Sequence, residues 1–202
     1  MKNEQVTKYG VAAVVVLYRP EQSVIDNIST YSDQVDIVLA VDNSESPNND
    51  IVFKIKENKK IEYIKNDGNK GVAHALNLAA ILAIKRNFRF LLTMDQDTRL
   101  GPGTVSTLIN LIESVDGNNI GIISPIHFEQ MNSPKLSYVL FTMTSANLLN
   151  LTIYQKIGPF REDFFIDHID HEYCLRLNTK GFKVAQVGGI RIDHEQIGRA
   201  HV

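Results

Sequence analysis

The sequence predicts an α/β fold with a mostly parallel sheet and helices on both of its faces, and three observations support this. Four short apolar runs in the first half alternate with segments whose apolar residues recur at helical spacing. Each run ends in polar residues, as parallel strands do at the edge of a sheet where ligands bind. The 202 residues, 44% of them hydrophobic, are enough to bury the core of one domain.

The first half is expected to repeat a strand and a helix. Short β-branched or apolar runs predict strands at residues 11–18, 35–41, 61–65 and 90–94. Apolar residues at helical spacing predict helices at 21–34 and 72–86. A cap signal at 46–50 predicts a short helix that follows it and ends at about residue 58. Right-handed crossovers would make the four strands parallel, so that their polar ends share one edge.

The second half is less regular and predicts mixed strands. We expect helices at 104–114, 154–157 and 169–180 and strands at 120–124, 184–187 and 189–192. Residues 130–135 are interpreted as a polar loop, 136–149 as a mixed apolar and hydroxyl-rich stretch, and 164–167 as extended. The whole chain, 1–202, is expected to form a single domain.

Composition limits the partners and the location. A net charge of -2 and a pI of about 6.3 argue against nucleic acid and against a polybasic membrane patch. A single cysteine, Cys174, excludes an internal disulfide and is compatible with the expected cytoplasmic location. Residues 1–10 lack the apolar core of a signal peptide, and the apolar runs are too short to span a bilayer. The chain stops at Ala200-His201-Val202, and we expect it to be truncated there.

Asp95 and Asp97 are the two acids most suggestive of chemistry, because they directly follow the buried strand at 90–94. Two carboxylates this close repel each other unless a positive charge lies between them. A divalent cation that also holds phosphate oxygens would satisfy both. The structural alternative is a polar turn, since Asp is common in turns.

Three other groups have a structural and a functional interpretation. Asp42 could accept hydrogen bonds from a base or a ribose, or cap the following loop. The glycine-containing loop at 66–71 could approach a phosphate at a helix N-terminus, or be a simple strand-to-helix turn. His194 follows a strand and could be a nitrogen ligand of a metal or a packed histidine.

A second acidic cluster lies at 167–172. Asp167, Asp170 and His171 are three and four residues apart, so a helix would bring them together. Glu172 and Arg176 predict a structural i,i+4 pair, whereas Asp170 has no such partner and favours a site role. No nucleophilic triad is apparent, and the surroundings of Cys174 indicate a packed thiol.

In this order and spacing the motifs resemble family 2, GT-A-type glycosyltransferases over residues 11–198, most closely the rhamnosyltransferase branch. Seven segments carry the resemblance: residues 14–20 (VVVLYRP), 41–44 (VDNS), 69–77 (NKGVAHALN), 94–97 (MDQD), 144–148 (TSANL), 157–160 (IGPF) and 165–176 (FIDHIDHEYCLR). It implies a GT-A fold with a nucleotide-binding half at about 10–100 and an acceptor and catalytic half at about 101–202.

The resemblance also implies an inverting, metal-dependent transfer of a sugar, rhamnose from dTDP-rhamnose, to a hydroxyl of a polysaccharide or glycolipid in polysaccharide biosynthesis. Mg²⁺ or Mn²⁺ would neutralise the leaving diphosphate and a carboxylate would take the acceptor proton. The residues that match the family's motifs are the general base Asp170, the metal-shell residues Asp95, Asp97 and His194, and the donor-site residues Tyr18, Arg19, Asp42, Lys70, Gly71, Asn77 and Asp95.

The sequence departs from this pattern in two places. Many relatives carry Gly where this chain has Ala146, and we expect the methyl group to narrow the donor pocket. Relatives usually continue beyond this C-terminus with helices that shape the acceptor side or dock at the inner face of a membrane. Two alternatives stay open: an inactive sugar-nucleotide-binding or scaffolding module, and a phosphohydrolase of the haloacid dehalogenase type, whose nucleophile loop residues 95–98 imitate.

Overall fold

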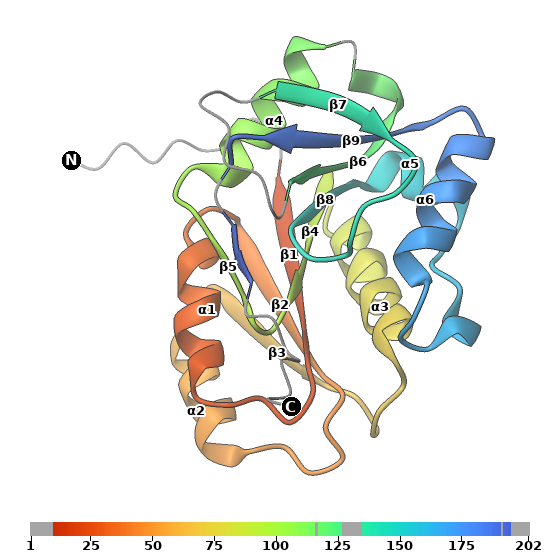
Figure 1. The fold of residues 1–202 in the computed structure, drawn as a ribbon. Helices are drawn as coiled ribbons and strands as arrows, with labels where there is room; N and C mark the ends of the chain where they lie inside the picture. The colour runs from red at the N-terminus through yellow and green to blue at the C-terminus, as the bar shows by residue number, and fades with distance from the viewer. Residues whose placement is uncertain (1–9, 116, 127–134, 191, 195–202) are drawn as a thin grey trace, which may run out of the picture.

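The computed structural model describes residues 10–115, 117–126, 135–190 and 192–194 (Figure 1). Within these residues the strands are β1 (Val11–Leu17), β2 (Ile37–Asp42), β3 (Ile61–Lys65), β4 (Phe90–Asp95), β5 (Thr98–Leu100), β6 (Ile120–Pro125), β7 (Lys135–Val139), β8 (Asn147–Asn150), β9 (Lys183–Gly188) and β10 (Ile192–His194). The helices are α1 (Ser23–Ser32), α2 (Asn49–Glu57), α3 (Val72–Lys85), α4 (Thr104–Ser114), α5 (Leu151–Ile157) and α6 (Ile169–Thr179), with short 3₁₀ helices η1 (Gly117–Asn119) and η2 (Glu162–Phe164).

The described strands form a large mixed sheet in the order β3-β2-β1-β4-β8-β6-β9-β7 and a small sheet of β5 and β10. The strands β1 to β4 are parallel, as the sequence predicts. Strand β8 runs antiparallel between β4 and β6, and β7 runs antiparallel to β9. The α/β class and the mixed second half are therefore both confirmed.

Helices cover both faces of the sheet (Figure 1). One apolar core packs α1, α2 and α4 against one face, and a second packs α3, α5 and α6 against the other. Five alanines of α3 are fully buried, and their small side chains let this helix lie close to the sheet. The cap signal before α2 is also confirmed, because Oδ1 of Asn48 accepts hydrogen bonds from the backbone N–H groups of Asp50 and Ile51.

The register of the parallel strands fixes where their ends lie. Leu17 of β1 lies beside Asp42 of β2, and Val16 of β1 lies beside Asp95 of β4. The loops that follow β1, β2 and β3 lie together at the bottom of Figure 1. The expectation that the first strand ends share one edge is therefore confirmed.

Some expectations for the second half were wrong. Residues 164–167, expected to be extended, form the end of η2 and a turn in which Phe165 has a φ of 51°. Asp167 consequently precedes α6 and is not on the helix with Asp170 and His171. The stretch at 136–149, left as mixed, contains most of β7 and part of β8. The expected loop at 130–135 lies mainly outside the described residues.

Candidate active site at the carboxyl edge of the sheet

The ends of β1 and β4 are fastened together by the side chain of Gln96. Its Oε1 accepts a hydrogen bond from the backbone N–H of Tyr18 at 3.0 Å, and its Nε2 donates to the carbonyl of Tyr18 at 3.3 Å. The backbone of Tyr18 is thereby held next to the turn that carries Asp95 and Asp97. Sequence reasoning missed this role, because a Gln between two acids carries no structural signal of its own.

Tyr18 and Arg19 form an exposed corner after β1. The guanidinium of Arg19 lies over the ring of Tyr18 at 5.0 Å and pairs with Glu45 at 3.3 Å. The backbone N–H of Arg19 donates to Oγ of Ser44, which ties this corner to the end of β2. Both predicted donor-site residues are therefore at the edge where a nucleotide could reach them.

Asp42 is fully buried at the end of β2. Its Oδ1 accepts a hydrogen bond from the N–H of Ser44 at 2.8 Å, and its Oδ2 accepts one from the hydroxyl of Tyr63 at 2.7 Å. Burial and this carboxylate raise the pKa of Tyr63 well above its ordinary value. Asp42 therefore caps the loop that follows β2, as the structural interpretation predicted. A direct contact of Asp42 with a base or a ribose stays a prediction.

The loop at 66–71 is tied to the end of β2 and to the turn before α6. The amide of Asn43 accepts a hydrogen bond from Asn66 and donates one to the carbonyl of Gly71. Gly71 has a φ of 84°, and the next N–H, that of Val72, donates to the carbonyl of Phe165 at 2.8 Å. Lys70 is exposed at the N-terminus of α3, where the helix dipole favours an anion.

The turn at 95–98 is supported by the segment 144–147. Oγ of Ser145 accepts a hydrogen bond from the N–H of Asp95 at 3.1 Å and donates one to Oγ1 of Thr98 at 2.7 Å. The N–H of Ala146 donates to the carbonyl of Thr93 on β4. Ala146 has a φ of 63°, a left-handed conformation that glycine adopts more readily than alanine.

The small sheet places the backbone of His194, one of the predicted metal ligands, beside the strand that follows Asp97. His194 of β10 is paired with Thr98 of β5, the residue after Asp97. The side chain of His194 lies outside the described part of the structure. Among the side chains that are described, no group of three His, Cys, Asp or Glu residues is placed to hold a metal. The convergence of Asp95, Asp97 and His194 therefore stays a prediction that the strand pairing permits.

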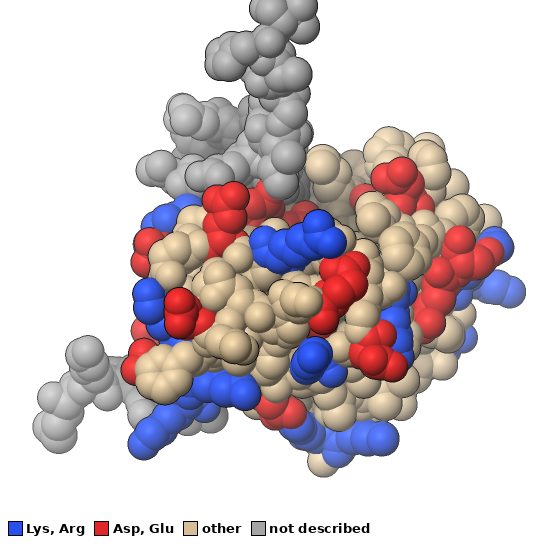
Figure 2. All heavy atoms as spheres, turned by 90° about the horizontal axis from the view of Figure 1, so that it is seen from below, with Lys and Arg blue, Asp and Glu red and all other residues tan. Residues whose placement is uncertain are grey.

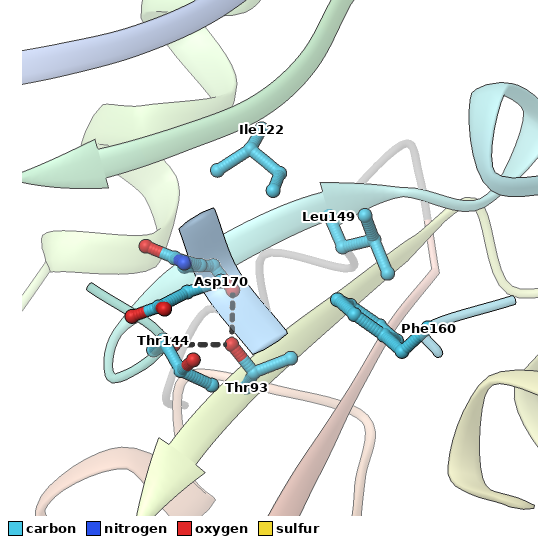
Figure 3. A pocket seen from close by; sticks show the side chains of 7 residues that line it. Thr93, Ile122, Thr144, Leu149, Phe160 and Asp170 are labelled. Carbon is cyan, nitrogen blue, oxygen red and sulfur yellow. Dashed lines mark hydrogen bonds between the residues drawn. The ribbon is translucent and has the colours of Figure 1, made fainter. Parts of the chain in front are cut away.

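Asp170 lines a small pocket between the end of β4 and the start of α6 (Figure 3). Thr93 and Thr144 lie on its polar side, where the hydroxyl of Thr93 donates to the carbonyl of Thr144 at 2.6 Å. Leu149 and Phe160 are among its apolar lining. Asp170 is in the first turn of α6, where the helix dipole favours a carboxylate.

Asn77 of α3 is held by four hydrogen bonds of its side-chain amide. Its Nδ2 donates to the carbonyl of Phe160 and to Glu162, and its Oδ1 accepts from the hydroxyl of Tyr154 and the N–H of Phe160. The side chain is buried, and these four bonds use the hydrogen-bonding capacity of an amide. These bonds connect α3 to the segment before α6, and a contribution of Asn77 to the donor site from behind Lys70 and Gly71 stays a prediction.

The expected pair of Glu172 and Arg176 is confirmed, with Nε of Arg176 2.8 Å from Glu172. The guanidinium also donates to the carbonyls of Ile157 and Pro159 at the end of α5. Glu172 and Arg176 therefore hold α6, and with it Asp170, against the preceding helix.

Figure 2, which looks onto the carboxyl edge, shows acidic and basic side chains intermixed on it.

Comparison with known proteins identifies the family of this chain. The family model Glycosyl transferase family 2 matches residues 13–174. The chain belongs to this family. A curated relative, the dTDP-rhamnosyl transferase RfbF of Shigella flexneri, is 24% identical over 207 residues, covering 92% of this chain and 69% of that protein.

Solved structures show that this family 2 chain has the GT-A fold. A crystal structure of GalNAc-T7 with UDP, GalNAc and Mn²⁺ has a TM-score of 0.77 at 11% identity, covering 92% of this chain and 44% of that one. S. aureus TarS has a TM-score of 0.69 at 14% identity, covering 89% of this chain and 35% of that one. The chain thus spans less than half the length of both proteins. No helix in the described part of the chain is both long and apolar enough to cross a membrane.

Proposed function

We propose that this family 2 chain transfers a sugar from a nucleoside diphosphate to an acceptor hydroxyl, with inversion and with Asp170 as the general base. One observation carries the proposal: Asp170 shares a pocket with Thr93, two residues before Asp95 on the same strand. A base near the acceptor and acids near the diphosphate would then act on opposite sides of one sugar. Direct displacement requires no protein nucleophile, and the buried Cys174 does not supply one.

The donor that we propose is dTDP-rhamnose, and the acceptor a hydroxyl of a polysaccharide or glycolipid. The support is the similarity to the dTDP-rhamnosyl transferase of Shigella flexneri. Tyr18, Arg19, Lys70 and Gly71 would line the donor site, with Asp42 behind them. An acceptor held at the cytoplasmic face of a membrane is part of the proposal.

Asp95, Asp97 and His194 would hold a divalent metal, Mg²⁺ or Mn²⁺. The two carboxylates are the part of this donor set that suits either ion, and the imidazole would complete the metal shell. The pairing of β5 with β10 brings the backbone of His194 beside the residue that follows Asp97. When bound, the metal would neutralise charge on the leaving diphosphate.

Nucleotide binding tests the donor side. We expect calorimetry to show that dTDP binds in the presence of Mn²⁺ more tightly than UDP does, and that Asp97→Ala abolishes the metal-dependent part. Asp33→Ala is the matched control, because Asp33 is an exposed acid after α1 that pairs only with Lys60 among the described residues. Preferential binding of UDP would contradict the rhamnosyl proposal.

Asp170→Asn tests the base. The amide keeps the shape of the side chain but cannot take a proton, so nucleotide binding should be unchanged while transfer stops. Asp167→Asn is the control, because Asp167 lies three residues earlier in an exposed turn. Full transfer by Asp170→Asn would show that the base is another residue.

The same measurements separate the two alternatives. An inactive sugar-nucleotide-binding module would bind nucleotide but release none from any sugar donor in the wild-type protein. A haloacid dehalogenase-type phosphohydrolase would release phosphate from phosphate esters. The family match and the position of Asp95 after the fourth strand both count against this second alternative.

A further inference from the structure

The ring of His171 contacts the carboxylate of the neighbouring residue, the proposed base Asp170. Its ring Nδ1 lies 2.8 Å from Oδ1 of Asp170, and its backbone N–H donates to the same oxygen at 2.8 Å. Among the described residues, Oδ2 of Asp170 accepts no hydrogen bond, whereas Oδ1 accepts these two. One oxygen of the carboxylate is therefore held by its neighbour and the other is available to a substrate.

The ring of His171 is itself held in place. Its centroid lies 4.4 Å from that of Phe141, with an angle of 35° between the rings. The ring of His168 meets it edge-on at 5.8 Å. The side chain of His171 is 43% exposed, so these aromatic contacts lie at the partly solvated surface beside Asp170 and not in the buried core. Packing on Phe141 limits rotation of the imidazole and keeps Nδ1 directed at the carboxylate.

We infer that His171 positions the base. This inference rests on the proposed function, since it concerns the carboxylate that would accept the proton of the acceptor hydroxyl. An ionised Asp170 accepts from Nδ1, so the imidazole must carry a proton there. That hydrogen bond fixes the rotation of the carboxylate, with Oδ1 held and Oδ2 left for the acceptor. A charge-assisted bond of this kind is among the stronger ones in proteins.

Two substitutions separate the hydrogen bond from the ring packing. In His171→Asn, the amide nitrogen occupies a position close to Nδ1 and can still donate to Asp170, but the stacking on Phe141 is lost. In His171→Phe, a ring still packs on Phe141, but there is no donor. We expect His171→Phe to lower kcat about 10- to 100-fold with an unchanged KM for the donor, and His171→Asn to retain most of the wild-type kcat.

The assay follows dTDP released from dTDP-rhamnose with Mn²⁺ and the best acceptor from a panel of sugar glycosides. His168→Asn is the comparison variant, because it removes only the edge contact with His171 and leaves the hydrogen bond to Asp170, so kcat should fall less than in His171→Phe. Asn tolerates the left-handed backbone at this position, where φ is 64°. Equal losses in His171→Asn and His171→Phe would contradict the inference, because the hydrogen-bond donor that Asn retains would then not preserve activity. Full activity of His171→Phe, with Asp170→Asn inactive, would overturn the inference and leave the base assignment intact.

A spectroscopic measurement tests the contact without any transfer. In ¹⁵N-resolved NMR spectra of the imidazole groups, the signal that disappears in His171→Phe should report a ring protonated at Nδ1. In Asp170→Asn this preference should weaken, because the charged acceptor is gone. A ring protonated only at Nε2 in the wild-type protein would refute the inference, whether or not the protein transfers a sugar.

Discussion

At the scale of single residues, Ser145 shows how the turn with Asp95 and Asp97 is held. Its hydroxyl accepts from the N–H of Asp95 and donates to the fully buried Thr98. The turn thus depends on a side chain about fifty residues away in the sequence. A buried polar group that loses its hydrogen-bond partner destabilises the folded state, because it is removed from water without compensation. Loss of the Ser145 hydroxyl would leave both the N–H of Asp95 and the hydroxyl of Thr98 without this partner.

We predict that Ser145→Ala lowers the free energy of unfolding by about 1–3 kcal/mol, because both hydrogen bonds are lost. Metal-dependent binding of dTDP should weaken as well, since the turn becomes less well ordered. Chemical denaturation and calorimetry measure the two effects. Ser106→Ala is the control, because the exposed hydroxyl of Ser106 makes one local bond to a backbone carbonyl. Unchanged stability and binding would show that Ser145 does not support the turn.

Cys174 gives a second prediction at this scale. Burial raises the pKa of its thiol to about 12. Compared with the ordinary value of 9.0, the thiolate fraction near neutral pH falls about a thousandfold. A thiol reagent such as DTNB should therefore label the native protein far more slowly than the protein in urea. Rapid labelling of the native protein would mean that α6 opens readily.

At the scale of elements, the loop before α3 and the turn before α6 are in contact at Gly71. A Cβ atom at this position would lie 2.6 Å from the carbonyl oxygen of Phe165. The same oxygen accepts the hydrogen bond from Val72. The predicted nucleotide loop and the helix that carries Asp170 are thus positioned by one backbone contact, which only glycine permits.

We predict that Gly71→Ala lowers the free energy of unfolding by about 2–5 kcal/mol, because left-handed strain adds to the clash with Phe165. Gly68→Ala is a matched control: it has a similar φ of 79°, but a Cβ there meets no atom within 4 Å. It should cost only about 1–2 kcal/mol. Denaturant titration measures both. Equal losses in the two variants would mean that the contact with Phe165 adjusts without cost.

Glu162 links α3 to η2 and gives a prediction about pH. Hydrogen bonds from Asn77 and then from His74 hold the pKa of Glu162 below its ordinary value of 4.5. Because the pKa of Glu162 is lower in the folded than in the unfolded protein, its ionised form stabilises the fold at pH values above its ordinary pKa. This stabilisation is lost as the pH falls through the lower pKa of the folded state. The side chain is half exposed, so solvent screening limits the effect to less than about 1 kcal/mol.

We therefore predict that Glu162→Gln makes stability less dependent on pH below about 4.5, while leaving Gln able to accept from Asn77. Urea midpoints measured between pH 7 and pH 3 test this. Glu113→Gln, at an exposed position on α4, is the control. A pH profile identical to that of the wild type would show that the bonds seen at Glu162 do not change its ionisation.

At the scale of the whole molecule, the sequence predicted the first half better than the second. Strands β1 to β4 are apolar runs separated by helical patterns, and their parallel arrangement follows from the connections. Strand β8 begins and ends with a buried asparagine and is only four residues long, so its pattern resembles a loop. Strand β5 has three residues and depends on pairing with β10, which a local pattern does not reveal.

The candidate site shows the same division. The acids Asp95, Asp97 and Asp170 could be selected from the sequence, because they follow a buried strand or begin a helix. Gln96 and Ser145 could not, since each acts through a hydrogen bond that depends on the folded chain. His171 was placed in the acidic cluster from the sequence, but its contact with Asp170 is evident only in the structure. The full hydrogen bonding of Asn77 likewise depends on Phe160 and Tyr154, which lie about eighty residues away.

The two expected halves of the domain share one sheet. Leu148 of β8 is 1% exposed and pairs with Leu92 of β4 on one side and Ile123 of β6 on the other. Because β8 comes from the second half and β4 from the first, the sheet is continuous across them. The halves should therefore unfold together, in a single transition that is reported alike by circular dichroism and by tyrosine fluorescence.

Leu148→Ala tests this directly. The cavity should lower the free energy of unfolding by about 2–5 kcal/mol. Both probes should shift to the same lower denaturant midpoint, because tyrosines of both halves, such as Tyr31 and Tyr173, are buried in the cores on either face of the sheet. An exposed leucine, Leu175 on α6, provides the control Leu175→Ala, for which we expect a much smaller change. Separate midpoints for the two probes in Leu148→Ala would show that the halves are independent folding units and that pairing across β8 does not couple them.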